Sequence, residues 1–172
     1  MNLDLLNRLS QVEFRATLAD IFEHSPWVPE RAWAQRPWPD IDTLHRALCD
    51  VVTAAGETAQ LALIRAHPQL ASKAALRGEL THASASEQSG AGLDQCSEEE
   101  LRQLTELNAS YADKFGFPFI LAVRGRTRPA IIANLAVRLF HRRDDEFSEA
   151  LRQIERIARL RLDALLKSPP TA

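Results

Sequence analysis

The sequence predicts an all-α protein, a single-domain bundle of roughly seven or eight helices that spans residues 1–172. Apolar residues recur at spacings of three, four and seven along most of the chain, which is the period of an amphipathic helix. Several Ser residues are followed three positions later by Glu, a pattern typical of helix starts, and no stretch alternates as a half-buried strand does. A chain of 172 residues is long enough for one domain with a substantial core.

The first predicted helix follows a capping-box pattern formed by Ser10 and Glu13, and its apolar face runs from Phe14 to Phe22. The next stretch, HSPWVPERAWAQRPWP, contains four prolines and all three tryptophans of the chain. We therefore expect an ordered, packed loop with one short helical turn rather than a flexible linker.

Two further helices follow this loop. Asp40 is placed to cap the first of them, and Gly56 separates it from the second, which should end at His67-Pro68 because a residue before proline avoids helical geometry. The negative end of a helix favours a protonated imidazole, which would suit His67 as a proton donor. A histidine that only caps the helix is the alternative.

The central part of the chain contains two more helix starts. Ser84 and Glu87 form a second capping-box pattern, which is enough to explain Glu87 without any catalytic role. Ser97, followed by three glutamates, opens a longer helix, and Gly116 is a natural C-cap for it. The predicted buried stripe of this helix consists of Leu101, Leu104, Leu107, Tyr111 and Phe115.

Two helices complete the chain. Thr127 caps the first, with Pro129 in its first turn, and the second runs from near Asp144 to about Lys167. The apolar stripe of the last helix consists of Phe147, Leu151, Ile154, Ala158 and Leu165.

Arg161 falls near the centre of this last stripe. A guanidinium keeps its proton, and burying it unpaired is costly. It either reaches solvent or pairs with a structural carboxylate, or it lies in a cavity for an anionic or carbonyl-rich ligand. In the ligand case, replacement by Met should leave thermal stability unchanged or slightly raised.

Composition excludes several classes of partner. The net charge of −2 lacks the basic excess that nucleic-acid binding requires. No apolar run reaches the roughly 20 residues of a membrane span, and MNLDLLNRLS does not resemble a secretory signal. Cys49 and Cys96 form no CxxC motif and are too few for a disulfide framework, so we expect a cytoplasmic protein.

Common cofactor and metal motifs are also missing from the sequence. The five histidines show no HExxH or other close ligand spacing, and no P-loop, GxGxxG or GxSxG motif occurs. We therefore expect a protein without a metal or cofactor, whose chemistry would come from His, Glu, Arg and backbone dipoles.

Four blocks carry a family resemblance: AHPQLASK, LTHASASEQSGAGLD, LNASYADKFGFPFILAVRG and the ending RLRLDALL. In this order and spacing they resemble the OHCU decarboxylases of urate degradation, and the similarity covers almost the whole chain, weakest across the tryptophan-rich loop. The resemblance implies an all-helical, cofactor-independent enzyme, usually a homodimer. Its substrate would be 2-oxo-4-hydroxy-4-carboxy-5-ureidoimidazoline (OHCU), and its product (S)-allantoin.

The family's motifs fall on defined residues of this chain. Its His-Pro pair falls on His67 and Pro68, its Ser-x-x-Glu-Gln motif on Ser84, Glu87 and Gln88, and its late arginine on Arg161. The implied substrate-contacting set is Pro68, Ser84, Ala85, Ser86, Glu87, Gln88, Phe119, Ile120, Leu121, Ala122, Val123 and Arg161.

Two positions depart from the family pattern. Gln69 stands where Asp is common, and Ser72 where Gly is common. Both lie beside the expected site and bear on the shape of the loop after His67, but neither replaces a proposed catalytic group.

The resemblance also implies a role for each residue. His67 would be the proton donor or relay, and Glu87 would fix His67 or the 4-hydroxyl of the substrate. Ser84 and Gln88 would bind ureido or ring groups, and Ser84 at a helix start would add backbone N–H groups. Arg161 would bind a ring carbonyl or developing negative charge.

The most apolar segment, KFGFPFILAVRG at 114–125, contains two residues that disfavour helix, Gly116 and Pro118. Pro118 would keep the chain extended, so the following backbone amides would be available to a planar heterocycle. The alternative is a buried connector between helices, whose backbone groups would also need partners.

Two other classes of function fit parts of the sequence. One is a non-catalytic helical ligand-binding or adaptor domain, against which the presence of His67, Glu87 and Arg161 argues. The other is an oligomerisation module built on the last helix, against which Arg161 on the apolar stripe argues.

Overall fold

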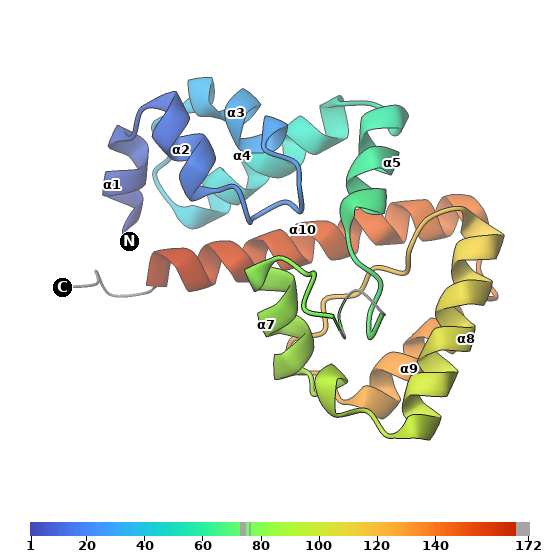
Figure 1. Ribbon diagram of the computed structural model, residues 1–172. Coiled ribbons are helices and arrows are strands. Elements are labelled where there is room, and N and C mark those ends of the chain that lie inside the picture. The colour runs from blue at the N-terminus through green and yellow to red at the C-terminus, as the bar shows by residue number, and fades with distance from the viewer. Residues whose placement is uncertain (73–74, 76, 168–172) are drawn as a thin grey trace. The chain divides into compact units, whose positions relative to one another are not determined.

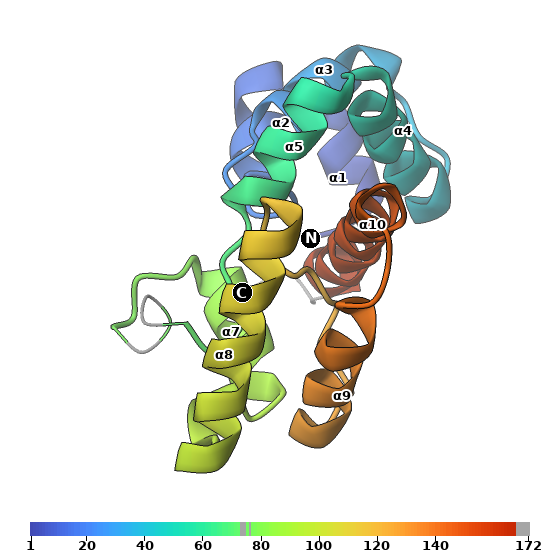
Figure 2. The ribbon, with the colours of Figure 1, turned by 90° about the vertical axis from the view of Figure 1, so that its right-hand side faces the viewer.

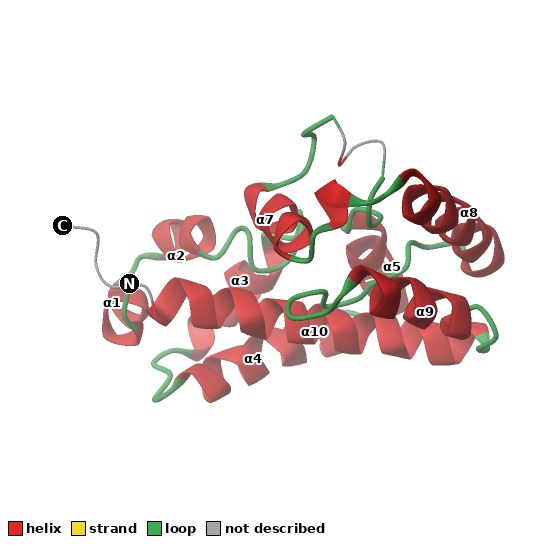
Figure 3. Cartoon of the chain, turned by 90° about the horizontal axis from the view of Figure 1, so that it is seen from below, coloured by secondary structure: helices red, strands yellow, loops and turns green. Residues whose placement is uncertain are grey.

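The computed structural model describes residues 1–72, 75 and 77–167, and within them the chain forms nine α-helices, two 3-10 turns and no strand (Figures 1 and 3). The predicted all-α class is therefore confirmed. The chain divides into two compact units, residues 1–66 with residues 155 onward, and residues 67–154. The long last helix, α10 (Arg143–Lys167), contributes its first turns to the second unit and its later turns to the first.

The first unit contains five helices besides its part of α10. They are α1 (Leu3–Arg8), α2 (Gln11–Thr17), α3 (Trp27–Ala32), α4 (Ile41–Ala54) and α5 (Glu57–Ala66), with a 3-10 turn at Trp33–Gln35.

Ser10 caps α2 as predicted. Its hydroxyl accepts a hydrogen bond from the Glu13 backbone N–H at 3.4 Å, and the Glu13 carboxylate accepts one from the Ser10 N–H at 2.9 Å. The predicted helix is too long, because α2 ends at Thr17 and the chain continues in turns to Phe22. Leu18 and Phe22 are nevertheless buried, so the apolar pattern correctly indicated burial but not the continuation of the helix.

The tryptophan-rich stretch is ordered, as predicted, but it holds more helix than expected, namely α3 and the 3-10 turn. The Asn7 side chain binds the end of this stretch through two hydrogen bonds. The Trp38 N–H donates to Asn7 Oδ1 at 3.0 Å, and Asn7 Nδ2 donates to the Trp38 carbonyl at 2.9 Å. Arg36 donates to the carbonyls of Asn7 and Leu9 at 3.0 and 2.6 Å. These bonds satisfy backbone groups at the end of α1 and fix the loop against it.

The next two helices also have the predicted boundaries. The Asp40 carboxylate caps α4 by accepting from the Thr43 N–H at 2.6 Å. Gly56, with φ of +80°, separates α4 from α5, which ends at Ala66. No single helix in the described parts of the chain is both long and apolar enough to cross a membrane. Helices α4 and α5 together have the length and the composition of a membrane span, but the pair is bent by 116°.

The second unit contains α7 (His82–Gly90), a 3-10 turn at Leu93–Gln95, α8 (Glu98–Phe115), α9 (Arg128–Arg138) and the start of α10. Helices α8 and α9 run side by side in Figure 2.

Helix α8 has the expected ends. Ser97 and Glu100 form a reciprocal capping box, and Gly116 ends the helix in the left-handed region with φ of +78°. Of the predicted stripe, Leu104, Tyr111 and Phe115 are buried, whereas Leu101 and Leu107 are half-buried. The fourth buried residue of the helix is polar, Asn108, which the apolar pattern could not indicate.

The last two helices begin close to their predicted starts. Thr127 occupies the N-cap position of α9 with Pro129 in the first turn, but its side chain makes no capping hydrogen bond. Helix α10 begins at Arg143, one residue before the expected Asp144.

Candidate active site

His67 is buried and directly follows α5, as the His-Pro pair predicted. It is the first residue of the second unit, and the loop after it leads towards α7. Pro68 beside it is half-buried. The chain therefore places the proposed proton donor at a helix end, where the carbonyl dipoles favour positive charge.

The start of α7 corrects a prediction. Thr81, not Ser84, is the N-cap, and its hydroxyl accepts from the Ser84 N–H at 3.3 Å. Ser84 and Glu87 therefore lie inside the helix, and the predicted capping box between them is wrong. The Ser84 N–H is also engaged by Thr81, so it is not one of the available amides expected at a helix start. The capping box therefore does not account for Glu87.

The predicted binding run 84–88 divides between two faces of α7. Ser84 and Gln88 are buried and Glu87 is half-buried, whereas Ala85 and Ser86 are exposed. This division follows from helical periodicity, because positions i, i+3 and i+4 share a face. The structure thus groups Ser84, Glu87 and Gln88 and separates them from Ala85 and Ser86.

Gln88 is engaged with the loop that follows His67. Its Oε1 accepts from the Ala71 N–H at 3.0 Å, and its Nε2 lies 3.5 Å from the Gln69 carbonyl. Asn108 holds the same loop by donating to the Leu70 carbonyl at 2.9 Å. These contacts from α7 and α8 fix the loop, so Gln88 acts on the shape of the site as well as being a predicted ligand contact.

The two departures from the family pattern lie in this loop. The Gln69 carbonyl faces Gln88, and the Ser72 hydroxyl accepts from the Ala75 N–H at 3.2 Å. Ala71 between them has φ of +50°, an uncommon value for a residue with a Cβ atom.

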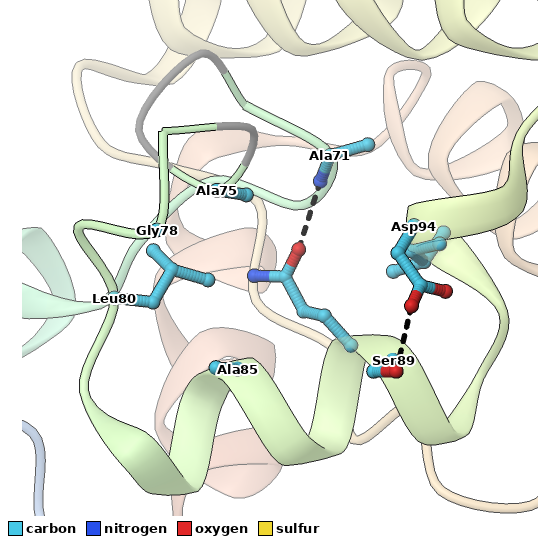
Figure 4. A pocket seen from close by; sticks show the side chains of 9 residues that line it. Ala71, Ala75, Gly78, Leu80, Ala85, Ser89 and Asp94 are labelled. Atoms are coloured by element: carbon cyan, nitrogen blue, oxygen red, sulfur yellow. Dashed lines mark hydrogen bonds between the residues drawn. The ribbon is translucent and has the colours of Figure 1, made fainter.

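A cavity of about 360 Å³ lies between this loop and the exposed side of α7 (Figure 4). Its lining includes Ala71, Leu80, Ala85, Gln88, Ser89 and Asp94. It shares Ala85 and Gln88 with the predicted set, but neither Glu87 nor the segment 119–123 lines it. The bond from the Ala71 N–H to Gln88, dashed in Figure 4, runs along its wall.

The segment 119–123 is buried at every residue. Tyr111 packs against Phe119 with ring centroids 5.4 Å apart and against Phe115 at 4.5 Å. The segment therefore has the apolar surroundings that strengthen hydrogen bonds to any group that its backbone meets.

Three polar side chains bind the backbone of this segment. Arg138 Nη1 donates to the Ile120 carbonyl at 2.8 Å, and the Ala122 N–H donates to Gln153 Oε1 at 3.0 Å. Arg126 Nε adds a bond to the Ala122 carbonyl at 3.1 Å.

Arg138 belongs to a buried ionic network. Its guanidinium donates to both oxygens of Glu146, with Nη2 at 2.7 Å, and neither side chain is more than 4% exposed. Tyr111 donates to Glu146, and His141 Nδ1 lies 2.7 Å from the same carboxylate. Burial, together with the bond to Glu146, raises the pKa of Tyr111 well above its usual range, so its proton stays on the phenol.

Sequence reasoning missed Arg138, Glu146 and Gln153. Arg138 shows the same sequence pattern as Arg161, a charged residue on an apolar helical stripe, because Arg138 follows Ile131 and Leu135 at helical spacing on the buried side of α9. In both helices, an arginine on an apolar stripe thus indicates a buried ion pair.

Arg161 lies in the first unit and is buried there. Its Nη1 donates to the Asp20 carbonyl at 2.7 Å and to Glu23 Oε2 at 3.0 Å. The structure therefore supplies the carboxylate partner that the sequence left open.

The Cys49 thiol is not activated as a nucleophile. Burial, followed by the nearby carboxylates Glu155 and Asp50, raises the pKa of Cys49 to about 12. Within the described residues, no three His, Cys, Asp or Glu side chains lie together as metal ligands would.

Comparison with known proteins supports one family. A model of the OHCU decarboxylase family matches residues 7–163, which include parts of both units. A 2-oxo-4-hydroxy-4-carboxy-5-ureidoimidazoline decarboxylase of Halalkalicoccus jeotgali is 39% identical over 93% of this chain and 89% of its own length. The uric acid degradation bifunctional protein PucL of Bacillus subtilis is 42% identical over 93% of this chain, which spans only 32% of that protein.

A solved structure agrees with these sequence matches. The crystal structure of an (S)-allantoin synthase aligns with a TM-score of 0.76 and 29% identity, over 98% of this chain and 55% of that chain. The family match covers far more than half of the residues. The chain belongs to the OHCU decarboxylase family.

Proposed function

We propose that this protein decarboxylates OHCU to (S)-allantoin in urate degradation, without a metal or organic cofactor. The observation that carries the proposal is the family match over residues 7–163 with the His-Pro and Ser-x-x-Glu-Gln motifs intact. The activity of the longer bifunctional relative beyond this region is not part of the proposal.

The substrate explains why His, Glu and Arg suffice. Loss of CO₂ from C4 of OHCU leaves a carbanion next to a ring C=N bond, so the ring itself accepts the electron pair. The protein has to hold the carboxylate out of the ring plane, stabilise the negative charge that moves into the ring, and deliver a proton to one face of C5, the carbon that carries the ureido group, while the C4 hydroxyl loses its proton and becomes a carbonyl of allantoin. Protonation of a single face makes the product chiral.

His67 is the proposed proton donor or relay, and Glu87 orients His67 or the 4-hydroxyl of the substrate. The position of His67 at the end of α5 supports the first role, because a protonated imidazole is favoured there. The position of Glu87 inside α7, on the same face as Ser84, supports the second, because no helix cap now requires this carboxylate. Arg161 is the proposed partner of a ring carbonyl or of developing charge.

The remaining contacts come from Pro68, the run 84–88 and the backbone of 119–123. Burial of Ser84 and Gln88 favours these two as the ligand contacts of their run, and exposure of Ala85 and Ser86 argues for a lesser role. The buried 119–123 segment would hydrogen-bond the N–H and C=O groups of the planar ring.

The assembly and setting of the enzyme are also proposals. We infer that residues 1–172 act as one domain, because the family match over residues 7–163 includes parts of both compact units. The resemblance favours a homodimer, and the cysteine usage favours the cytoplasm.

Freshly made OHCU tests the proposed function. Its decay is followed by ultraviolet absorbance, and the handedness of the product by circular dichroism, with and without the purified protein. We expect faster decay, dextrorotatory (S)-allantoin and no effect of EDTA. Racemic product formed at the uncatalysed rate would contradict the proposal and would favour the non-catalytic ligand-binding alternative.

A further inference from the structure

Side chains hold one edge of the backbone of the segment 119–123, while on the other edge the Val123 carbonyl accepts from the Arg126 N–H at 2.9 Å. Ile120 and Ala122 are two residues apart, and in extended backbone the N–H and C=O groups of alternate residues point to the same side. Arg138 binds the carbonyl of Ile120, and Gln153 binds the N–H of Ala122. The two side chains, which we call the edge clamp, therefore occupy the same edge of the segment.

The edge clamp is itself rigidly held. Arg138 is tied to the buried Glu146 carboxylate through Nε and Nη2, and its guanidinium lies 4.6 Å from the centre of the Phe119 ring. Gln153 is 9% exposed, and its Nε2 donates to Glu149 Oε1 at 2.7 Å, which fixes the direction of its amide. Both clamp residues therefore present one atom to the segment in a set orientation.

The opposite edge carries the backbone groups of Phe119, Leu121 and Val123. Leu121 and Val123 are each 4% exposed, and their N–H groups donate to no other group in the described part of the chain. Buried backbone amides are rarely left without an acceptor, so this edge has the character of a ligand-binding surface.

We propose that Gln153 and Arg138 are positioning residues, which hold one edge of the segment so that the N–H groups of Leu121 and Val123 face the ring of the substrate. The proposal rests on the proposed function and adds to it the atoms that meet the ligand and the side chains that aim them. Neither clamp residue touches the substrate in this arrangement. Their effect is to keep the segment in its binding-competent conformation.

This role has a distinctive kinetic consequence. Without the clamp, only a fraction of molecules holds the segment correctly, and the apparent dissociation constant rises by the inverse of that fraction. Once substrate is bound the segment is in place, so the rate of the bound complex changes little. The expected result is a raised KM with a nearly unchanged kcat.

Gln153→Met is the first test, because Met matches the length of Gln but offers no oxygen to the Ala122 N–H. We expect KM for OHCU, and Kd for added (S)-allantoin, to rise by about tenfold, with kcat within threefold of the unsubstituted protein. Gln60→Met is the matched control: Gln60 likewise hydrogen-bonds to backbone, donating to two carbonyls at 3.1 Å each, but it lies in the first unit. It should leave KM and Kd unchanged.

Gln153→Glu separates positioning from stability. It restores an oxygen for the Ala122 N–H but places a carboxylate beside Glu149 one turn away, so its melting temperature should fall. We nevertheless expect its Kd for (S)-allantoin to stay within threefold of the unsubstituted value. The inference would be overturned if the affinity for (S)-allantoin fell in parallel with the melting temperature across the two variants. It would also be overturned if Gln153→Met left KM and Kd unchanged.

Amide signals give a direct reading of the edge itself. In a nuclear magnetic resonance titration with (S)-allantoin, the N–H signals of Leu121 and Val123 should shift and become protected from solvent exchange, whereas Ala122 is already protected. Shifts confined to Ala122 would overturn the assignment of the edge. Absence of turnover by the unsubstituted protein would instead overturn the proposed function, and the inference with it.

Discussion

Arg161 donates from Nη1 to Oε2 of Glu23 at 3.0 Å, and the two side chains are only 5% and 1% exposed. A second bond from the same nitrogen reaches the Asp20 carbonyl at 2.7 Å. A buried ion pair is costly to break, since removing one partner leaves the other as an uncompensated charge. This pairing does not preclude a catalytic role, because a guanidinium has five N–H donors. It does change what a substitution at Arg161 should do.

Arg161→Met should destabilise the protein. From the sequence we expected unchanged or slightly raised stability, but the buried Glu23 carboxylate reverses that expectation, with a loss of about 3–5 kcal/mol. Thermal unfolding should show a drop in Tm of roughly 6–20 °C for a chain of this size. Arg159→Met, on the same helix but in part-exposed ion pairs, should cost less than about 1 kcal/mol.

The double variant Glu23→Gln/Arg161→Met separates folding from catalysis. The neutral amide removes the stranded charge, so most of the lost stability should return, while kcat/KM should stay reduced by roughly 10²–10⁴ if Arg161 serves the transition state. Arg161→Lys should not restore turnover, because a point charge cannot replace the planar fork. Recovery of activity together with stability would show that Arg161 is structural only.

Cys49 should resist alkylation while the protein is folded. Burial raises the pKa of its thiol to about 12, so at pH 8 the reactive thiolate is on the order of 10⁻⁴ of the population. Because the folded pKa lies above the unfolded one, the associated stability is present below the unfolded pKa and is lost as the pH rises towards 12. Iodoacetamide at pH 8 should leave turnover unchanged and label Cys49 only in denaturant, as mass spectrometry would detect. Rapid labelling of the folded protein would contradict this burial.

Tyr111→Phe should weaken the buried network without abolishing the site. The phenol donates to the Glu146 carboxylate, and hydrogen bonds to charged groups contribute about 1.5–3 kcal/mol. We expect chemical denaturation to show a loss in that range, with kcat within about threefold, because Arg138 still binds the Ile120 carbonyl. A fall in turnover of 10² or more with little loss of stability would place Tyr111 in the chemistry.

The helix boundaries that carried local signals were predictable, and those that depended on packing were not. Ser10, Asp40, Gly56 and Gly116 were assigned correctly, since each acts through bonds to its own neighbours or through its own φ. The end of α2 was missed because the turns after Thr17 bury the same apolar residues as a longer helix would.

For the site, the burial of a key residue was predictable from the sequence, but the polar partners of the site residues were not. The burial of Arg161 followed from its place on an apolar stripe, but its partner Glu23 is 138 positions away along the chain, and no spacing rule connects the two. Gln153 reaches Ala122 across 31 positions, and Gln88 reaches Ala71 across 17. Such long-range polar contacts depend on tertiary structure, which a single sequence does not reveal.

The start of α7 shows how one cap changes the meaning of a residue. Both Thr81 and Ser84 are good N-cap residues, and only Ser84 has a Glu three positions later, which favoured the later start. The structure uses Thr81 instead, so a local pattern that looked complete was coincidental. The carboxylate that this pattern had explained now needs another explanation.

Glu87→Gln is the sharpest test of that explanation. Because Thr81 caps α7, the substitution removes no cap of this helix, and the free energy of unfolding should fall by less than the about 0.5–2 kcal/mol of a lost cap. If Glu87 orients His67 or the 4-hydroxyl of the substrate, kcat should fall by on the order of 10² or more, because the amide cannot take up or hold a proton. Thr81→Ala is the matched control: it should cost about 0.5–2 kcal/mol of stability yet keep kcat within tenfold. Normal turnover by Glu87→Gln, alongside a stable fold, would remove Glu87 from the catalytic set and leave His67 to act without it.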